Sequence, residues 1–107
     1  MRRAARTDRN HREIIEALRA AGAAVTDTSA VGGGYPDLTV SYRRAWYLIE
    51  VKDGEKSPSR RKLTKAQQDW HAQQQAAVHV VKDAHEALVA IGAVTPAGDR
   101  WALDNIS

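Results

Sequence analysis

The sequence predicts an α/β domain in which a small mixed sheet is flanked by helices. Residues 37–42 and 46–52 alternate apolar and polar side chains with the period of two that is typical of strands. Apolar residues recur at helical spacing on either side of this pair of segments. At 107 residues, the chain is long enough for one hydrophobic core but not for two independent ones. We therefore expect one domain.

The first expected element is a helix that starts near Asn10. Asn10 and Glu13 have the spacing of a capping box, and Ile14 and Leu18 then share one face. Gly22 follows the last residue of this apolar pattern and is expected to end the helix.

The central prediction is a β-hairpin, entered through a loop with three consecutive glycines. If Arg43 and Arg44 close it, alone or with one neighbour on each side, paired residue numbers sum to 87 and Asp37 stands opposite Glu50. Directly opposed residues lie about 4.5–5.5 Å apart at Cβ, where like charges destabilise a sheet. A divalent ion with oxygen ligands removes that repulsion. Lys52 lies on the same face as Glu50, because side chains alternate along a strand.

The remaining elements follow from periodicity and from glycine, proline and serine content. We expect a short strand over residues 23–28, a mobile basic loop over 53–62 and a second helix over 64–75. A buried strand over 78–81 and a third helix over 83–91 complete the pattern.

Composition excludes several classes of protein. Lysine and arginine outnumber aspartate and glutamate by 16 to 13, and they cluster in residues 2–12 and 56–65, where they fit phosphate binding or solvated surface. The absence of cysteine excludes disulfides and thiolate chemistry and suits the cytoplasm. The arginine-rich start lacks the apolar core of a secretory signal, and no run approaches the roughly 20 apolar residues of a membrane span.

The chain resembles the PD-(D/E)XK nuclease superfamily, and within it VRR-NUC-type phage nucleases similar to Holliday junction resolvases. The resemblance rests on the order of elements and on three motifs. These motifs are Gly-Gly-Gly-Tyr-Pro-Asp ending at Asp37, Ile-Glu-Val-Lys ending at Lys52, and Leu63-Thr64 followed by Gln67. The resemblance covers residues 10–91. It implies one nuclease domain over 1–107, with a restriction-endonuclease-like αβββαβ core and a C-terminal extension over 92–107.

The resemblance also implies roles for the hairpin residues. Asp37 and Glu50 match metal-binding carboxylates, and the backbone carbonyl of Val51 would complete the inner shell of ligands. Lys52 matches a lysine that orients or deprotonates the attacking water, or steadies charge on the phosphate. Mg²⁺, with Mn²⁺ as an alternative, suits such hard oxygen ligands. The reaction implied is phosphodiester hydrolysis that leaves a 5′-phosphate.

Two further site residues are implied by the resemblance. Gln67 matches a glutamine that contacts the metal site or the phosphate. Glu13 matches an acidic residue of the first helix, although related resolvases can carry that acid slightly earlier, where this chain has His11. Both residues also have a structural interpretation as capping residues, Glu13 with Asn10 and Gln67 with Thr64.

Polar and basic residues near the site are candidates for DNA contact, with solvated surface as their alternative. They are Ser29 and Tyr35 beside the glycine loop, and Arg60, Arg61, Lys62 and Lys65 after the second hairpin arm. We interpret His71 as a solvated histidine, with an approach to the site as its alternative. We interpret Trp46, Trp70 and Trp101 as core or interface residues, with base-stacking platforms as their alternative.

The expected function is that of a metal-dependent DNA endonuclease with branched DNA, such as a Holliday junction, as its substrate and a homodimer as its assembly. One alternative is a general nickase that acts with a partner protein. Another is a non-catalytic nucleic-acid-binding module, and a third is a structural or assembly protein. In the last two, Asp37, Glu50 and Lys52 form a solvent-facing polar stripe whose ion pair contributes about 0–1 kcal/mol.

Overall fold

The computed structural model describes residues 3–52 and 62–95. Within these ranges the chain forms α1 (Arg3–Ala20), β1 (Ala24–Asp27), β2 (Leu38–Tyr42), β3 (Ala45–Val51), α2 (Lys65–Ala72), β4 (Val78–Val81) and α3 (Ala84–Ala90). The predicted order of elements is therefore confirmed. The basic loop over 53–61 and residues 96–107 of the expected extension lie outside the described residues.

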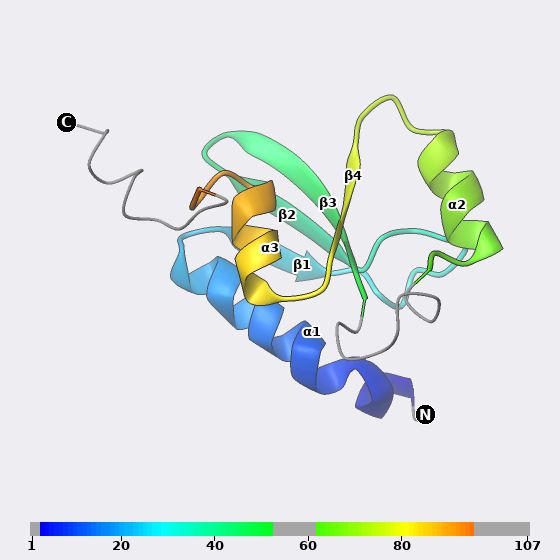
Figure 1. Ribbon diagram of the computed structural model, residues 1–107, viewed down its shortest axis with the longest axis horizontal. Helices are drawn as coiled ribbons and strands as arrows, with labels where there is room; N and C mark the ends of the chain where they lie inside the picture. Colours follow the sequence, from blue (N-terminus) through cyan, green and yellow to red (C-terminus); the bar gives the residue numbers. More distant parts are fainter. Residues whose placement is uncertain (1–2, 53–61, 96–107) are drawn as a thin grey trace.

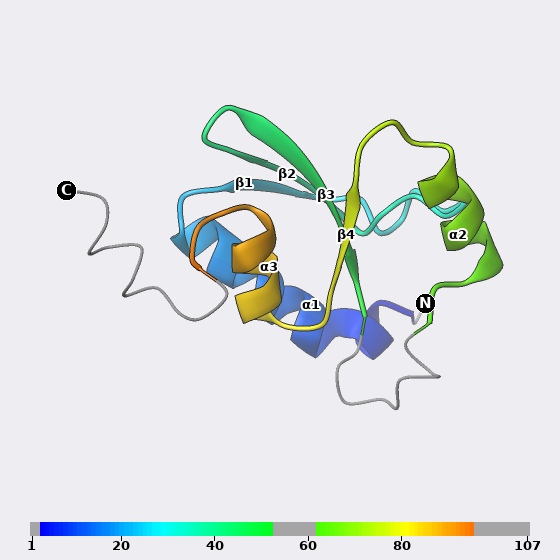
Figure 2. The same ribbon diagram turned by 45° about the horizontal axis from the view of Figure 1, so that its top comes forward.

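The strands form one mixed sheet in the order β1-β2-β3-β4. The β1–β2 and β2–β3 pairs are antiparallel, and the β3–β4 pair is parallel, because the chain crosses over through α2 between these strands. Figures 1 and 2 show α1 and α3 side by side against one face of the sheet, whereas α2 lies apart from both. The fold class is the predicted one. No helix in the described ranges is long and apolar enough to cross a membrane.

The hydrophobic core lies between the sheet and the pair α1 and α3. Leu38, Val40 and Ile49 point from the central strands to this side and are completely buried. Ile14 and Leu18, one helical turn apart on α1, meet them and are also completely buried. Each such side chain contributes about 1.5–3 kcal/mol of hydrophobic free energy, so this layer holds the hairpin against α1.

A two-residue turn at Arg43 and Arg44 closes the β2–β3 hairpin. Of the two closures that the sequence allowed, the structure has the shorter one. Both arginines have positive φ angles, 49° and 71°, as a type I′ turn requires. This turn fixes the register of the whole hairpin.

Helix α1 begins earlier than predicted and ends where predicted. The capping-box interpretation of Asn10 is wrong, because α1 starts at Arg3 and Asn10 lies inside it. No glycine or proline interrupts residues 3–10, so helical propensity continues back through this segment. The helix ends at Ala20, just before Gly22, whose φ of 102° allows its amide and that of Ala23 to bond carbonyls of the last turn.

The later helices begin with the predicted caps. Thr64 and Gln67 form a reciprocal capping box at α2, and the Asp83 side chain accepts a hydrogen bond from the Glu86 amide at α3. Strand β4 is less buried than predicted, since only Val81 lies in the core, whereas Val80 is exposed.

Gly34 is the point where the glycine loop packs against α2. Its φ is 91°, and a Cβ atom placed on it would lie 2.2 Å from the backbone oxygen of Ala66. No side chain fits in this space. Gly34 therefore allows the loop before Asp37 to contact the helix that carries Gln67.

We expect Gly34→Ala to lower the free energy of unfolding by more than Gly32→Ala does. Both positions have positive φ, so both variants lose about 1–2 kcal/mol from backbone strain. Only the Gly34 variant also clashes with α2, because nothing lies within 4 Å of a Cβ at Gly32. Urea denaturation of the two variants and the wild type measures this difference. Equal losses would contradict a close approach of the loop to α2.

Candidate active site

Asp37 and Glu50 lie opposite each other across the β2–β3 hairpin. The strands pair Leu38 with Ile49 and keep this register to the turn, so the predicted sum of 87 is confirmed. Asp37 directly precedes β2, and Glu50 follows Ile49 in β3. The Asp37 carboxylate accepts a hydrogen bond from the Val51 amide, with 2.9 Å between Oδ2 and N. The hairpin thus brings both carboxylates to one end of the sheet.

Glu50 is a buried carboxyl group beside a second carboxylate. Only 2% of the residue is exposed. Burial, the charge of Asp37 and a side-chain hydrogen bond with Asp37 raise its pKa to about 8, although Lys52 opposes them. Among the described residues, Glu50 Oε1 receives no hydrogen bond from an N–H or hydroxyl donor. A buried acceptor without a donor is costly, and a bound cation would satisfy it.

Lys52 and Gln67 form a network with the other oxygen of Glu50. Gln67 Nε2 donates to Glu50 Oε2 over 2.6 Å, while its Oε1 accepts from Lys52 Nζ over 2.8 Å. The Lys52 ammonium lies 3.8 Å from Glu50 Oε2. Gln67 Oε1 also accepts from the Thr64 amide, so the capping residue and the site residue are the same side chain. The two interpretations of Gln67 are therefore compatible.

Helix α1 reaches the same end of the sheet through Asn10. Its Nδ2 donates to the backbone oxygen of Lys52 over 3.0 Å, directly after β3. This role was not predicted from the sequence. Asparagine has a low helical propensity, so its position inside a helix is the one available signal that Asn10 makes a tertiary contact.

His11 follows Asn10 and is buried against β1. It is 8% exposed, and its Nε2 lies 3.2 Å from Asp27 Oδ2. Ser29 donates its amide and its hydroxyl to the other oxygen of Asp27. Burial disfavours ionisation of Asp27, but the Ser29 bonds and His11 outweigh it, so the pKa of Asp27 lies below its usual value. Ser29 is thus part of a local network, and its contact with DNA stays a prediction.

The structure does not bring Glu13 to the carboxylate pair. Its side chain is 64% exposed and lies 3.6 Å from Arg9 on the outer face of α1. It is not a capping residue either, since α1 begins at Arg3. The described residues hold no group of three or more histidine or acidic residues able to bind a metal. The candidate site therefore has two carboxylates.

Aromatic residues of α2 contact the segment before Asp37. The rings of Tyr35 and Trp70 meet edge to face with centroids 5.0 Å apart, so Trp70 packs α2 against this segment. His71 is not the solvated residue that the sequence indicated. It is partly buried, and both this burial and the charge of Lys52 lower its pKa.

The predicted basic contacts are only partly described. Lys62 and Lys65 are exposed, and Lys65 pairs with Asp69 over 3.0 Å in the next turn of α2. Arg60 and Arg61 lie outside the described residues.

The donors at the carboxylate pair fit a hard divalent cation. The two carboxylates supply oxygen ligands only, and one carboxylate oxygen has no donor in the described part of the chain, whereas the Val51 carbonyl as a third ligand stays a prediction. Mg²⁺ prefers such ligands and keeps several water molecules. The donor set does not suit zinc, because it includes neither sulfur nor a histidine nitrogen.

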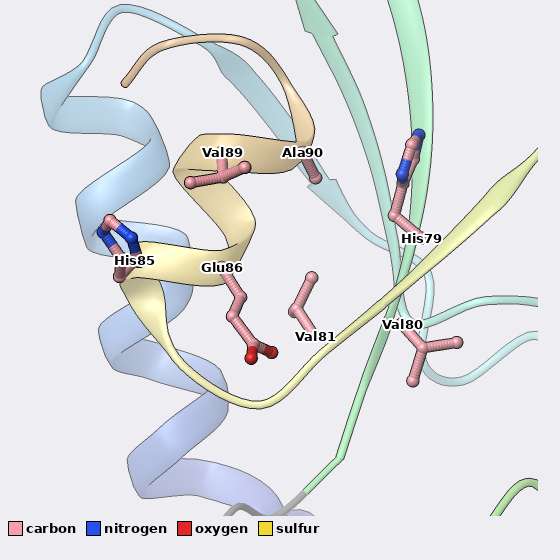
Figure 3. Close-up of a pocket in the computed structure, with 7 residues that line it drawn as sticks. All are labelled: His79, Val80, Val81, His85, Glu86, Val89 and Ala90. Atoms are coloured by element: carbon pink, nitrogen blue, oxygen red, sulfur yellow. The ribbon is translucent and has the colours of Figure 1, made fainter. Parts of the chain in front are cut away.

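A separate hollow of about 410 Å³ lies between β4 and α3. Figure 3 shows Val81 and Glu86 projecting into it from the two elements, with His79 farther along β4. None of the candidate site residues lines this hollow. The hollow is therefore distinct from the carboxylate site.

Comparison with known proteins identifies the fold. No protein-family model matches the sequence, and a search of curated proteins gives no significant match. Among solved structures, a VRR_NUC domain superposes on this chain with a TM-score of 0.54. The two are 27% identical, and the match covers 76% of this chain and 90% of the other. The chain has the fold of a VRR-NUC domain.

The VRR-NUC fold confirms the resemblance to PD-(D/E)XK-type nucleases and supports a nuclease domain. Nucleases of this type generally use divalent metal ions. In the VRR-NUC fold seen here, the oxygen-only donor set is consistent with that general property.

The raised pKa of Glu50 predicts an unusual dependence of stability on pH. Because the folded state holds the Glu50 proton up to about pH 8, whereas the unfolded state releases it near its ordinary pKa of 4.5, metal-free protein loses stability as the pH rises between these values. Glu50→Gln keeps the group neutral. We expect this variant to exceed the wild type by up to about 5 kcal/mol at pH 8.5, since the pKa rises by about 3.5, from 4.5 to about 8, at about 1.4 kcal/mol per pKa unit.

Urea denaturation in EDTA at pH 5 and pH 8.5 checks this expectation. The difference between the variant and the wild type should be small at pH 5. Parallel pH profiles would show that Glu50 ionises normally in the folded protein.

Proposed function

We propose that this chain is a Mg²⁺-dependent DNA endonuclease that hydrolyses phosphodiester bonds. The observation that carries the proposal is the burial of Glu50 opposite Asp37, with one carboxylate oxygen that receives no N–H or hydroxyl hydrogen bond in the described residues and the Lys52 ammonium beside the other. A solvent-facing polar stripe does not bury a carboxyl group in this way. The VRR-NUC fold supports the same function.

Asp37, Glu50 and the Val51 carbonyl would hold the Mg²⁺ ion, with Mn²⁺ as an alternative. When bound, the ion would lower the pKa of a water molecule that it ligates, and it would place positive charge beside the scissile phosphate. Ligation requires Glu50 to lose its proton. Binding of the ion is therefore coupled to the pH of the medium.

Lys52 and Gln67 act on the substrate side of the site. The Lys52 ammonium orients the attacking water or offsets the charge of the phosphate, and only its neutral amine form would be able to deprotonate the water. Gln67 is a positioning residue, because it bonds Lys52, Glu50 and the Thr64 amide together and so fixes where the ammonium lies. In-line attack on the phosphate yields a 5′-phosphate and a 3′-hydroxyl.

Branched DNA is the proposed substrate, and a homodimer is the proposed assembly. A two-fold dimer would place one carboxylate site on each of two strands of a junction. The exposed Lys62 and Lys65, together with Ser29, Tyr35, Arg60 and Arg61, are the proposed DNA contacts. A non-catalytic module fits less well, because two opposed carboxylates repel an incoming phosphate unless a cation lies between them.

Plasmid nicking tests the enzyme proposal. We expect Lys52→Ala to lower the cleavage rate of supercoiled plasmid in Mg²⁺ about 100-fold or more, because the water or the phosphate loses its cationic partner. DNA affinity, measured in Ca²⁺, should stay within about threefold, since one phosphate contact accounts for little of it.

Lys82→Ala is the matched control. It removes the same charge from the start of α3, where Lys82 pairs with Glu86. This variant should cleave like the wild type. Absence of cleavage by the wild type on plasmid, four-way junction and flap would favour the non-catalytic module.

A further inference from the structure

Trp46 is the most exposed large hydrophobic side chain in the described part of the chain, with 75% of its surface accessible. The sequence analysis had interpreted it as a core or interface residue, and the core interpretation is wrong. Its neighbours across the sheet are small, because β3 pairs Trp46 with Ser41, and β2 pairs Ser41 with Ala24. Strand β4 begins opposite Leu48 and does not extend to Trp46. The indole therefore stands uncovered on a flat row of small residues.

Trp46 lies on the same face of the sheet as Glu50. Side chains at positions 46, 48 and 50 of one strand point the same way, opposite to the buried Ile49. Four residues of strand span about 13 Å at 3.3 Å per residue. A DNA strand that follows β3 can therefore contact both Trp46 and the carboxylate site.

The hairpin turn next to Trp46 carries two positive charges on an unfavourable backbone. Arg43 and Arg44 both have positive φ, where Asn-Gly or Gly-Gly forms the turn without strain. Both side chains are exposed, and the Arg43 guanidinium lies 5.1 Å from the centroid of the Tyr42 ring. Because Asn-Gly would form this turn without strain, the two arginines suggest that positive charge at the turn serves a function such as binding an anion.

We propose that Trp46, Arg43 and Arg44 form a hairpin-tip contact for an unpaired DNA segment, in which the indole stacks on a base and the arginines bind flanking phosphates. The proposal rests on the proposed nuclease function for its substrate and adds which DNA feature is recognised. Every base offers a flat face to an exposed tryptophan, but a base inside a duplex is already stacked. The contact thus favours DNA with unpaired bases within a few nucleotides of the scissile phosphate.

Charge favours DNA over a second copy of the chain at this surface. A two-fold contact through Trp46 would bring the paired arginines of both copies toward each other, and like charges so placed repel. A nucleic-acid backbone supplies the opposite charge. Trp46 and Glu50 also lie on the same face of one strand, β3. In Figures 1 and 2 the turn lies at the end of the hairpin away from α2, where the described elements leave it open.

Substitution of Trp46 tests the stacking contact. Trp46→Ala should raise the Kd for a splayed-arm DNA in Ca²⁺ about tenfold, which is within the range for the loss of one stacked base. The Kd for a fully paired duplex should stay within about twofold, since a duplex offers no free base. Trp46→Phe should restore most of the lost affinity. An unchanged Kd for the splayed DNA would overturn the proposal.

The size of the particle in solution distinguishes the rival occupant. If Trp46→Ala converts a dimer into a monomer in light scattering, the surface is an interface between copies and the proposal fails. If the wild type does not cleave plasmid in Mg²⁺, only the proposed nuclease function is contradicted. The comparison of Kd values in Ca²⁺ does not depend on cleavage and still tests the hairpin-tip contact.

Replacement of the turn tests the arginines. The double variant Arg43→Asn, Arg44→Gly should melt at a higher temperature than the wild type, because Asn-Gly fits positive φ, and yet bind splayed DNA at least about fivefold more weakly, because two phosphate contacts are lost. The control, Arg19→Gln with Lys82→Gln, removes the same charge elsewhere and should lose less affinity. Equal losses in the two double variants would show that net charge, not the hairpin tip, determines binding.

Discussion

The opposition of Asp37 and Glu50 across one hairpin is the constraint on which the rest of the structure depends. Two carboxyl groups at adjacent strand positions cannot both ionise out of water at low cost, and burial of Glu50 raises its pKa to about 8. The ion pair with Lys52 does not by itself remove the cost of ionising both carboxyl groups. Lys52 lies 3.8 Å from one oxygen of Glu50, while the other receives no hydrogen bond from an N–H or hydroxyl donor within the described residues, and the protonated Glu50 hydrogen-bonds Asp37 in the metal-free protein. The site is therefore arranged for a cation that the chain itself does not supply.

The helices around the sheet hold the two carboxyl groups in this position. Helix α1 and α3 fix one face of the sheet through a compact aliphatic layer, and Asn10 ties α1 to the backbone directly after β3. On the other side, the capping box of α2 places Gln67 between Lys52 and Glu50. Local helix initiation and the geometry of the site share one side chain. A substitution at Gln67 would disturb both.

The hairpin register was predictable from sequence, because turn length and alternation together leave few choices for pairing. The caps of α2 and α3 were predictable for the same local reason. The role of Asn10 was not, since capping-box spacing occurs by chance inside helices and only the packing of α1 decides where it begins. The exposure of Trp46 was missed because an aromatic residue on a strand is normally covered by a neighbour, whereas here the cross-strand residues are Ser41 and Ala24.

The most direct test is a titration of Mn²⁺ into metal-free protein at pH 7, with free Mn²⁺ followed by electron paramagnetic resonance and released protons counted in weak buffer. The wild type should bind the ion and release about one proton, because Glu50 must ionise to become a ligand. Asp37→Asn and Glu50→Gln should each abolish this binding. Equal binding by both variants and the wild type, without proton release, would contradict a cation site between the two carboxyl groups.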